Sequence, residues 1–180
     1  MKPQIFAIGL GISALVASGS AAAQGRAPTT ATSFDEASSF SLPSQVNLRE
    51  IFRAYRKVSN THSTEFYWPE NWEKIGFILE GSLGFISSTP FAGGTAIYGC
   101  GGPGNWNYFS SVDENCEGQV VEPYGRKGYI ATSQLPGTMP LFRCVFRWNG
   151  KHFRHFDTLQ ANCEGVPGAV NNGPLGYVFL

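Results

Sequence analysis

An internal threefold repeat constrains this 180-residue chain more than any other feature. Four anchors recur in the same order in three copies, and their first members lie 46 and 44 residues apart. They are an aromatic-led triplet (Phe52-Arg53-Ala54, Tyr98-Gly99-Cys100, Phe142-Arg143-Cys144), an aromatic residue (Phe66, Phe109, Phe153), an Asn-x-Glu triplet (Asn71-Trp72-Glu73, Asn115-Cys116-Glu117, Asn162-Cys163-Glu164) and a glycine-led closure (Gly84-Phe85-Ile86, Gly128-Tyr129-Ile130, Gly176-Tyr177-Val178). A fixed period of about 20 to 50 residues indicates a supersecondary unit that cannot bury its apolar face alone.

The N-terminal part of the chain predicts export. Residues 1–23 have the pattern of a secretory signal peptide, with Lys2, an apolar run and the small residues Ala21-Ala22-Ala23 before the cleavage point. The apolar run is shorter than the roughly 20 residues that a membrane span needs. We therefore expect no membrane span and a secreted or periplasmic location. Residues 24–45 are rich in Ser and Thr and predict a flexible leader.

Residues 46–180 have the size of one domain, with repeats at about 48–92, 93–137 and 138–180. The chain carries 13 basic and 13 acidic residues, so its formal net charge is zero. A basic surface is the usual sign of nucleic-acid binding, and its absence argues against a nucleic-acid partner. We expect no cofactor.

The cysteines follow the repeat. Cys100 and Cys116 lie in the second copy and Cys144 and Cys163 in the third, at the same two repeat positions. Ala54 and Trp72 take both positions in the first copy. Four cysteines allow three pairings, and this joint gain and loss selects the disulfides Cys100–Cys116 and Cys144–Cys163. The chain has no closely spaced C-x-x-C pair, so we expect no metal site.

The local pattern of each copy predicts an all-β domain. In the third copy we expect strands at 141–146, 152–156 and 175–179, with a hairpin turn at Asn149-Gly150. In the first copy we expect four strands, at 51–56, 65–68, 74–79 and 83–86. Three such copies predict a closed, pseudo-threefold body of the β-trefoil type, because closure removes exposed sheet edges. An open three-bladed array is the alternative.

The chain also resembles a repeat domain of unknown function that occurs, usually in three copies, in secreted bacterial and fungal proteins. That family has the pattern LYR…HFYT…EG…GYI, and the resemblance covers residues 48–180. Phe52-Arg53, Phe142-Arg143, His152-Phe153, Glu80-Gly81 and the three closures carry it. The chain departs from the pattern at Gly99, where arginine is expected, and at Tyr108. The resemblance implies a trefoil-like fold and an accessory role, with no assigned chemistry.

Catalytic patterns are weak in this sequence. His152 and His155 are three apart, so on a strand they point to opposite faces, and Phe153 is expected to be a core anchor on the face of His155 and Asp157. The Gly-x-Ser-x-Gly nucleophile turn is absent. The carboxylates of Glu70, Asp113, Glu114 and Asp157 are conceivable glycosidase pairs, but most of them recur with the repeat, which is unusual for one asymmetric active site. We therefore expect no enzyme.

Symmetry favours binding instead. Sugars stack on aromatic rings and bond to nearby polar groups. The candidate ligand-binding residues fall into three groups: Trp106 with Asn107 and Asp113, Trp148 with Asn149 and Asp157, and Trp68 with Glu70. The sequence predicts a secreted, non-catalytic module that binds carbohydrate or a cell-surface polymer. The alternatives are a protein-binding module, such as a protease inhibitor or host-interaction factor, and a small hydrolase using His155 and Asp157.

Overall fold

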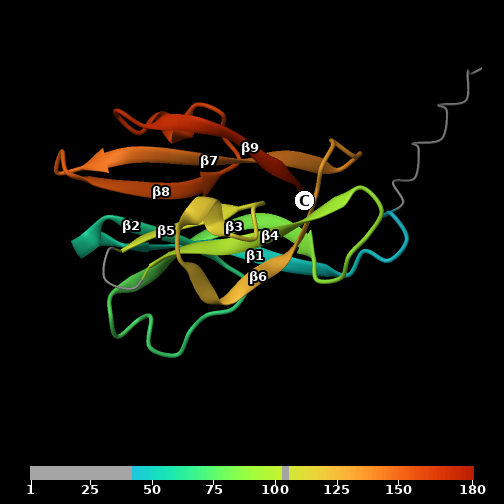
Figure 1. The fold of residues 1–180 in the computed structure, drawn as a ribbon, viewed down its shortest axis with the longest axis horizontal. Helices are drawn as coiled ribbons and strands as arrows, with labels where there is room; N and C mark the ends of the chain where they lie inside the picture. The colour runs from blue at the N-terminus through green and yellow to red at the C-terminus, as the bar shows by residue number, and fades with distance from the viewer. Residues whose placement is uncertain (1–41, 103–105) are drawn as a thin grey trace, which may run out of the picture. The chain divides into compact units, whose positions relative to one another are not determined.

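Each sequence copy folds into the same antiparallel unit of a long, a short and a second long strand (Figure 1). The computed structural model describes residues 42–102 and 106–180, which lie in one compact unit, Ser38–Leu180. The strands are β1 (Leu48–Arg56), β2 (Thr61–Glu65) and β3 (Phe77–Ser87) in the first copy, β4 (Gly94–Gly102), β5 (Asn107–Ser111) and β6 (Val121–Ala131) in the second, and β7 (Thr138–Trp148), β8 (His152–Thr158) and β9 (Val170–Phe179) in the third. The described residues contain no α-helix, and the predicted all-β class is confirmed.

The first strand of each unit pairs with both of the others: β1 with β2 and β3, β4 with β5 and β6, and β7 with β8 and β9. The first copy has three described strands where the sequence predicts four. Segments 74–79 and 83–86 were expected to be separate, but residues 77–79 and the whole of 83–86 belong to the single strand β3. The strand expected at 65–68 lies earlier in the chain, at Thr61–Glu65. The register between β1 and β3 shifts beside Glu80 and Leu83, so these irregularities bend the strand without ending it.

The hairpin predicted in the third copy is confirmed. Strands β7 and β8 pair up to Trp148 and His152, and the backbone N–H of Lys151 donates to the carbonyl of Trp148. Asn149 and Gly150 have φ angles of 50° and 67°. Positive φ at both central positions is what a β-turn of the primed type requires, and Asn-Gly adopts it at little cost. Strand pairing ends at Trp148 and His152, so three residues, Asn149 to Lys151, connect the two strands.

The glycine-led closures lie where the copies meet. Strand β3 pairs with β6 and with β9, and β6 also pairs with β9, so each third strand contacts the other two. A Cβ atom on Gly84, Gly128 or Gly176 would lie 2.6 or 2.7 Å from a backbone carbonyl oxygen of another copy. Only glycine permits this approach. The short strands β2, β5 and β8 also pack against one another.

The main core collects equivalent aliphatic residues from all three copies. Its seven buried members are Ile51, Leu83, Ile86, Ile97, Ile130, Leu141 and Val178. Burying each of these side chains contributes about 1.5–3 kcal/mol. Because the set draws on every copy, no single copy contains the whole core.

The aromatic anchors of the repeat are not structurally equivalent. Phe109 pairs with Cys100, and the third-copy residue at the equivalent position is Phe156, which pairs with Cys144. Phe156 is buried, whereas Phe153 is 50% exposed. The expectation that Phe153 is a core anchor is therefore wrong. The sequence pattern aligned it three residues too early because Phe153 and Phe156 both precede polar residues on the same strand.

The predicted signal peptide lies outside the described residues, as does most of the predicted leader. The end of that leader is described, and the carbonyl of Gln45 accepts a hydrogen bond from the Thr89 hydroxyl at 2.7 Å. None of the residues described here forms a helix that is long and apolar enough to cross a membrane.

Candidate functional site

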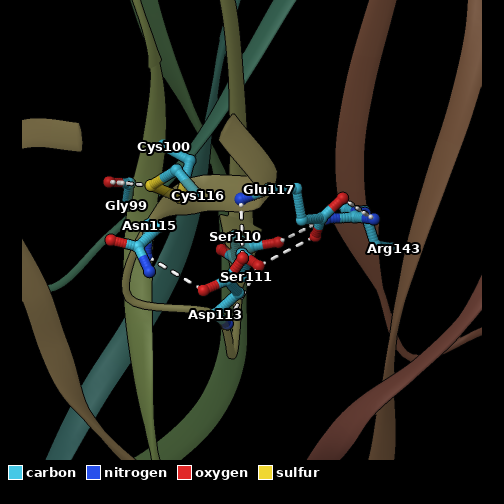
Figure 2. Close-up of a disulfide and its surroundings, with 9 residues drawn as sticks. All are labelled: Gly99, Cys100, Ser110, Ser111, Asp113, Asn115, Cys116, Glu117 and Arg143. Atoms are coloured by element: carbon cyan, nitrogen blue, oxygen red, sulfur yellow. Dashed lines mark hydrogen bonds and ion pairs between the residues drawn. A yellow bond between two sulfur atoms is a disulfide. The ribbon is translucent and has the colours of Figure 1, made fainter. Parts of the chain in front are cut away.

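Both predicted disulfides, Cys100–Cys116 and Cys144–Cys163, are confirmed. Each joins the first strand of its copy to a short 3-10 turn, η2 (Cys116–Gly118) or η3 (Cys163–Gly165). The carboxylate of Asp113 accepts the backbone N–H groups of Asn115 and Glu117, both at 3.0 Å (Figure 2). Asp113 therefore shapes the disulfide loop. It follows β5, whereas Trp106 precedes that strand, so the two residues predicted to share a pocket lie at opposite strand ends.

The disulfide loops aim glutamates at the neighbouring copy. Arg143 donates to both carboxylate oxygens of Glu117, at 2.6 and 3.1 Å, and to the carbonyl of Ser110 (Figure 2). Arg53 repeats this arrangement with Glu164, at 2.7 and 3.0 Å, and with the carbonyl of Asp157. The hydrogen bonds from the arginines lower the pKa of both glutamates. These bidentate pairs join the copies.

The second copy replaces the missing arginine with a lysine from another strand. Gly99 is equivalent to Arg53 and Arg143, and Lys127 donates to the carbonyl of Thr64, which is the position equivalent to Ser110 and Asp157. A Cβ atom on Gly99 would meet the carboxylate of Glu122 and would lie 2.7 Å from Cε of Lys127. The lysine thus occupies the space that an arginine at 99 would enter. The glycine at position 99, where the other two copies have arginine, thus has a structural compensation.

The interior around Lys127 is electrostatically dense. Glu65 lies 4.0 Å from the ammonium group, and both side chains are almost fully buried. Burial alone would lower the pKa of Lys127, but Glu65 and Glu122 raise it. Burial also raises the pKa of Glu122 to about 7, against the opposing effect of Lys127. This cluster belongs to the packing between copies.

His155 and Asp157, the residues of the hydrolase alternative, contact different neighbours. Asp157 is only 2% exposed, and one of its carboxylate oxygens accepts from the Ser110 hydroxyl at 2.5 Å. Nδ1 of His155 lies 2.9 Å from the side-chain oxygen of Asn107. Burial and the nearby Arg143 lower the pKa of His155 to about 4. The two side chains are committed to different neighbours, and Asp157 lies away from the hairpin turn with Trp148 and Asn149.

The tryptophans at 106 and 148 are each covered by an arginine. The guanidinium of Arg56 lies 4.2 Å from the ring centre of Trp106, and that of Arg154 lies 5.0 Å from the ring centre of Trp148. The carbonyl of Trp106 also accepts from the Thr61 hydroxyl at 2.7 Å. Both indoles are half-buried. One face of each ring therefore already carries a cation–π contact.

Trp68 is placed differently, in the lining of a cavity of the first copy. The cavity has a volume of about 640 Å³. Its aromatic lining comes from three residues, Phe52, Trp68 and Phe77. Its other lining residues are Glu50, Glu73, Gly76, Ile78, Leu79 and Ser82. Glu70, predicted to accompany Trp68, is exposed and is not part of this lining.

An aromatic cluster stands in the first copy where the other copies have a disulfide. Trp72 takes the second cysteine position and stacks on Phe77, with ring centres 4.3 Å apart. Trp68 meets the edge of Trp72 at 5.5 Å and lies 5.9 Å from Phe52. This cluster holds the loop between β2 and β3 against β1, and the cavity opens beside it. Aromatic contacts of this kind contribute about 0.5–1.5 kcal/mol each beyond area burial.

Two carboxylates line the aromatic pocket without a partner. The side-chain carboxylates of Glu50 and Glu73 make no hydrogen bond or ion pair with another described residue, and both residues are exposed. The exposed side chains of Ile78 and Leu79 complete an apolar rim. The arrangement offers flat aromatic surface, apolar contact and hydrogen-bond acceptors in one place. These are the components of a small-molecule or sugar site.

A second cavity, of about 200 Å³, lies between the first and third copies. Its charged residues are Arg53, Glu80 and Glu164, and the guanidinium contacts both carboxylates. His62 also contacts Glu80, at 2.8 Å. The charged side chains of this cavity are thus paired with one another.

Sequence reasoning identified Trp68 but missed Glu50, Phe52, Glu73 and Phe77. The available signal was the joint loss of the two cysteine positions in the first copy, which marks the one copy whose loop is held by side-chain packing. The pocket therefore lies where the repeat is least regular. Comparisons with protein-family models, curated proteins and solved structures find no match to this chain.

Proposed function

We propose that this chain is an exported, non-catalytic binding module that takes carbohydrate, or another cell-surface polymer, in the pocket of the first copy. The observation that carries the proposal is the cavity of about 640 Å³ with Trp68 and Phe52 in its lining and free carboxylates beside them. Its volume lies within the range of about 300–1,000 Å³ that is typical of ligand pockets. The two confirmed disulfides and the predicted signal peptide support export to an oxidising compartment.

The proposal includes a β-trefoil-like architecture and kinship with the secreted repeat domain that the sequence resembles. Its support is the mutual pairing of β3, β6 and β9 and the equivalent pairing inside each copy. Such closed scaffolds present loops at their periphery, where one copy can diverge without disturbing the shared core. The first-copy loop between β2 and β3 is the divergent one here.

The non-catalytic part of the proposal has electrostatic support. A glycosidase acid needs a raised pKa so that it holds a proton at neutral pH. The two glutamates of the smaller cavity, Glu80 and Glu164, have lowered pKa values. The raised pKa of Glu122 belongs to the buried cluster around Lys127, away from the lining of the aromatic pocket.

Binding to a glycan array tests the proposal. The purified chain is expected to bind at least one glycan above background, and Trp68→Ala is expected to weaken that binding about tenfold, equivalent to about 1.4 kcal/mol. Trp106→Ala is the matched control, because that ring lies under Arg56 and is absent from the pocket lining. No binding on a broad panel, or equal loss in both variants, would contradict a carbohydrate site at Trp68.

A protein-binding role is the second candidate. Ile78 and Leu79 are 60% and 61% exposed on β3 at the pocket rim, and exposed aliphatic side chains favour protein contacts. If this candidate holds, Ile78→Ser with Leu79→Ser would reduce capture of a protein partner, and the parent chain would bind no glycan on the array.

A further inference from the structure

We propose that the aromatic pocket takes a cationic amino-sugar unit, whose ammonium group pairs with Glu73 and Glu50 while its ring stacks on Trp68. The inference rests on the proposed carbohydrate-binding function and narrows it to polymers that carry free amines. It begins from the charge that the repeat leaves unpaired in the first copy.

Glu73 is the first-copy glutamate of the Asn-x-Glu triplet that recurs in all three copies. Its two counterparts, Glu117 and Glu164, each accept a bidentate arginine from a neighbouring copy. Following the same cyclic order, the partner of Glu73 would come from position 99, which is glycine. Lys127 replaces that arginine only at the carbonyl of Thr64, and the carboxylate beside its ammonium group is that of Glu65, not that of Glu73. The first-copy glutamate thus lacks the cation that its two counterparts have.

Glu73, which lacks an arginine partner, lines the pocket. Glu73 approaches it from the loop between β2 and β3, and Glu50 approaches it from β1. The three arginines of β1 make their contacts elsewhere: Arg49 with the carbonyl of Lys127 and the ring of Phe66, Arg53 with Glu80 and Glu164, and Arg56 with the carbonyl of Ile75 and the ring of Trp106. The cavity consequently has two carboxylates and no lining cation.

Aromatic faces and carboxylates together favour an ammonium group. A cation over an indole or phenyl ring is attracted by the negative face of the ring, and nearby carboxylates add direct attraction. An isolated ammonium would leave most of a cavity of about 640 Å³ unfilled. A hexosamine unit supplies in addition an apolar ring face for Trp68 and hydroxyl groups that can donate to the carboxylates. Charge complementarity therefore selects an amino sugar over a neutral one.

The test compares three oligosaccharides of equal length and linkage by isothermal titration calorimetry. They are a glucosamine oligomer with protonated amines, its N-acetylated form and the corresponding glucose oligomer. We expect the free-amine form to bind about tenfold more tightly than the other two at low salt, with the difference shrinking as salt screens the carboxylates.

Glu50→Gln with Glu73→Gln removes the charge while retaining shape. This double variant is expected to lose the amine preference and to bind the glucose oligomer within about twofold of the parent chain. Glu70→Gln is the matched control, since Glu70 is exposed in the same loop and lies outside the lining. Urea unfolding of each variant checks that the fold is intact.

The outcomes separate the two proposals. Equal affinity for all three oligosaccharides, lost in Trp68→Ala and unaffected in the glutamine variant, overturns the amino-sugar inference and leaves the carbohydrate function standing. Absence of binding to every oligosaccharide overturns both. A lysine-rich peptide that binds more tightly than the free-amine oligomer and competes with it at this pocket also overturns the inference, because the cation would then come from a protein.

Discussion

At residue scale, position 127 shows how one copy accommodates a lost arginine. Leu83 and Leu175 precede the closure glycines of the first and third copies, and Lys127 holds the same place in the second. The lysine is 4% exposed and reaches the Thr64 carbonyl beside Glu65. The buried ammonium group of Lys127 binds the Thr64 carbonyl at the junction between copies, which Gly99 has no side chain to reach.

Replacing Lys127 by leucine is expected to lower the free energy of unfolding by about 3–5 kcal/mol, because Glu65 loses its buried partner. Gly99→Arg combined with Lys127→Leu restores the pattern of the other copies and should recover part of this loss. Urea unfolding measures both variants. An unchanged stability in Lys127→Leu, or a double variant weaker than the single one, would show that the lysine does not replace the arginine.

The stability of the protein should also depend on His155. Its folded pKa is about 4, below the ordinary value of 6.5, so between these values the unfolded chain binds more protons than the folded chain. Stability is therefore complete above about pH 6.5 and falls as the pH drops toward 4. His155→Gln should flatten this part of the stability profile, measured by urea unfolding at several pH values. The exposed His152→Gln serves as control, and an equal flattening there would refute the assignment.

At element scale, the loops between the second and third strands are held in two ways. Disulfides hold those of the second and third copies, and the Trp72–Phe77 stack holds that of the first. The disulfide loops end in glutamates that reach arginines, whereas the aromatic loop lines a pocket. The two loops held by disulfides thus form junctions between copies, whereas the loop held by aromatic packing forms the proposed binding site.

Cys144→Ala with Cys163→Ala is expected to lower the free energy of unfolding by about 3 kcal/mol, since the bridge closes a loop of 19 residues. Ligand binding at the first-copy pocket should survive under native conditions. Trp72→Ala should show the converse, with a clear loss of binding because Trp68 and Phe77 lose their shared neighbour. Urea unfolding and titration calorimetry on both variants give the comparison; binding lost in the cysteine variant and retained in Trp72→Ala would reverse these roles.

At the scale of the whole molecule, the three copies are joined by the close approach of their third strands, β3, β6 and β9. A methyl group on Gly128 would lie 2.6 Å from the carbonyl oxygen of Ser87, which belongs to a different copy. Backbone cannot move aside as a flexible side chain can. The cost therefore falls on the contact between copies.

Gly128→Ala is expected to lower the free energy of unfolding by about 1–3 kcal/mol or more, as overpacking does. Gly81→Ala is the matched control, because Gly81 has a similar positive φ but no atom within 4 Å of the added methyl group. Any backbone cost is common to both variants, so the difference in urea unfolding isolates the steric term. Equal destabilisation of the two would argue that closure does not require the glycine.

Repetition allowed several features to be predicted from local positions alone. Both disulfides follow from which residues occupy equivalent places in the repeat. The Asn149-Gly150 turn and the all-β class follow from local sequence patterns. The strand ends were predicted less well. Segments 74–79 and 83–86 largely merged into β3, because glycine next to a bulge bends a strand as readily as it ends one.

The chain alone therefore determined its repeat, its cysteine pairing and its strand-forming character, since each depends on residues close together in the sequence or on equivalent positions. Tertiary structure decided which groups meet across the copies. Lys127 reaches Thr64 over 63 residues, and Arg53 reaches Glu164 over 111. It also left Glu73 unpaired beside Trp68. No local pattern encodes these partners. Side-chain contacts between copies depend on how the pairing of β3, β6 and β9 brings distant positions together.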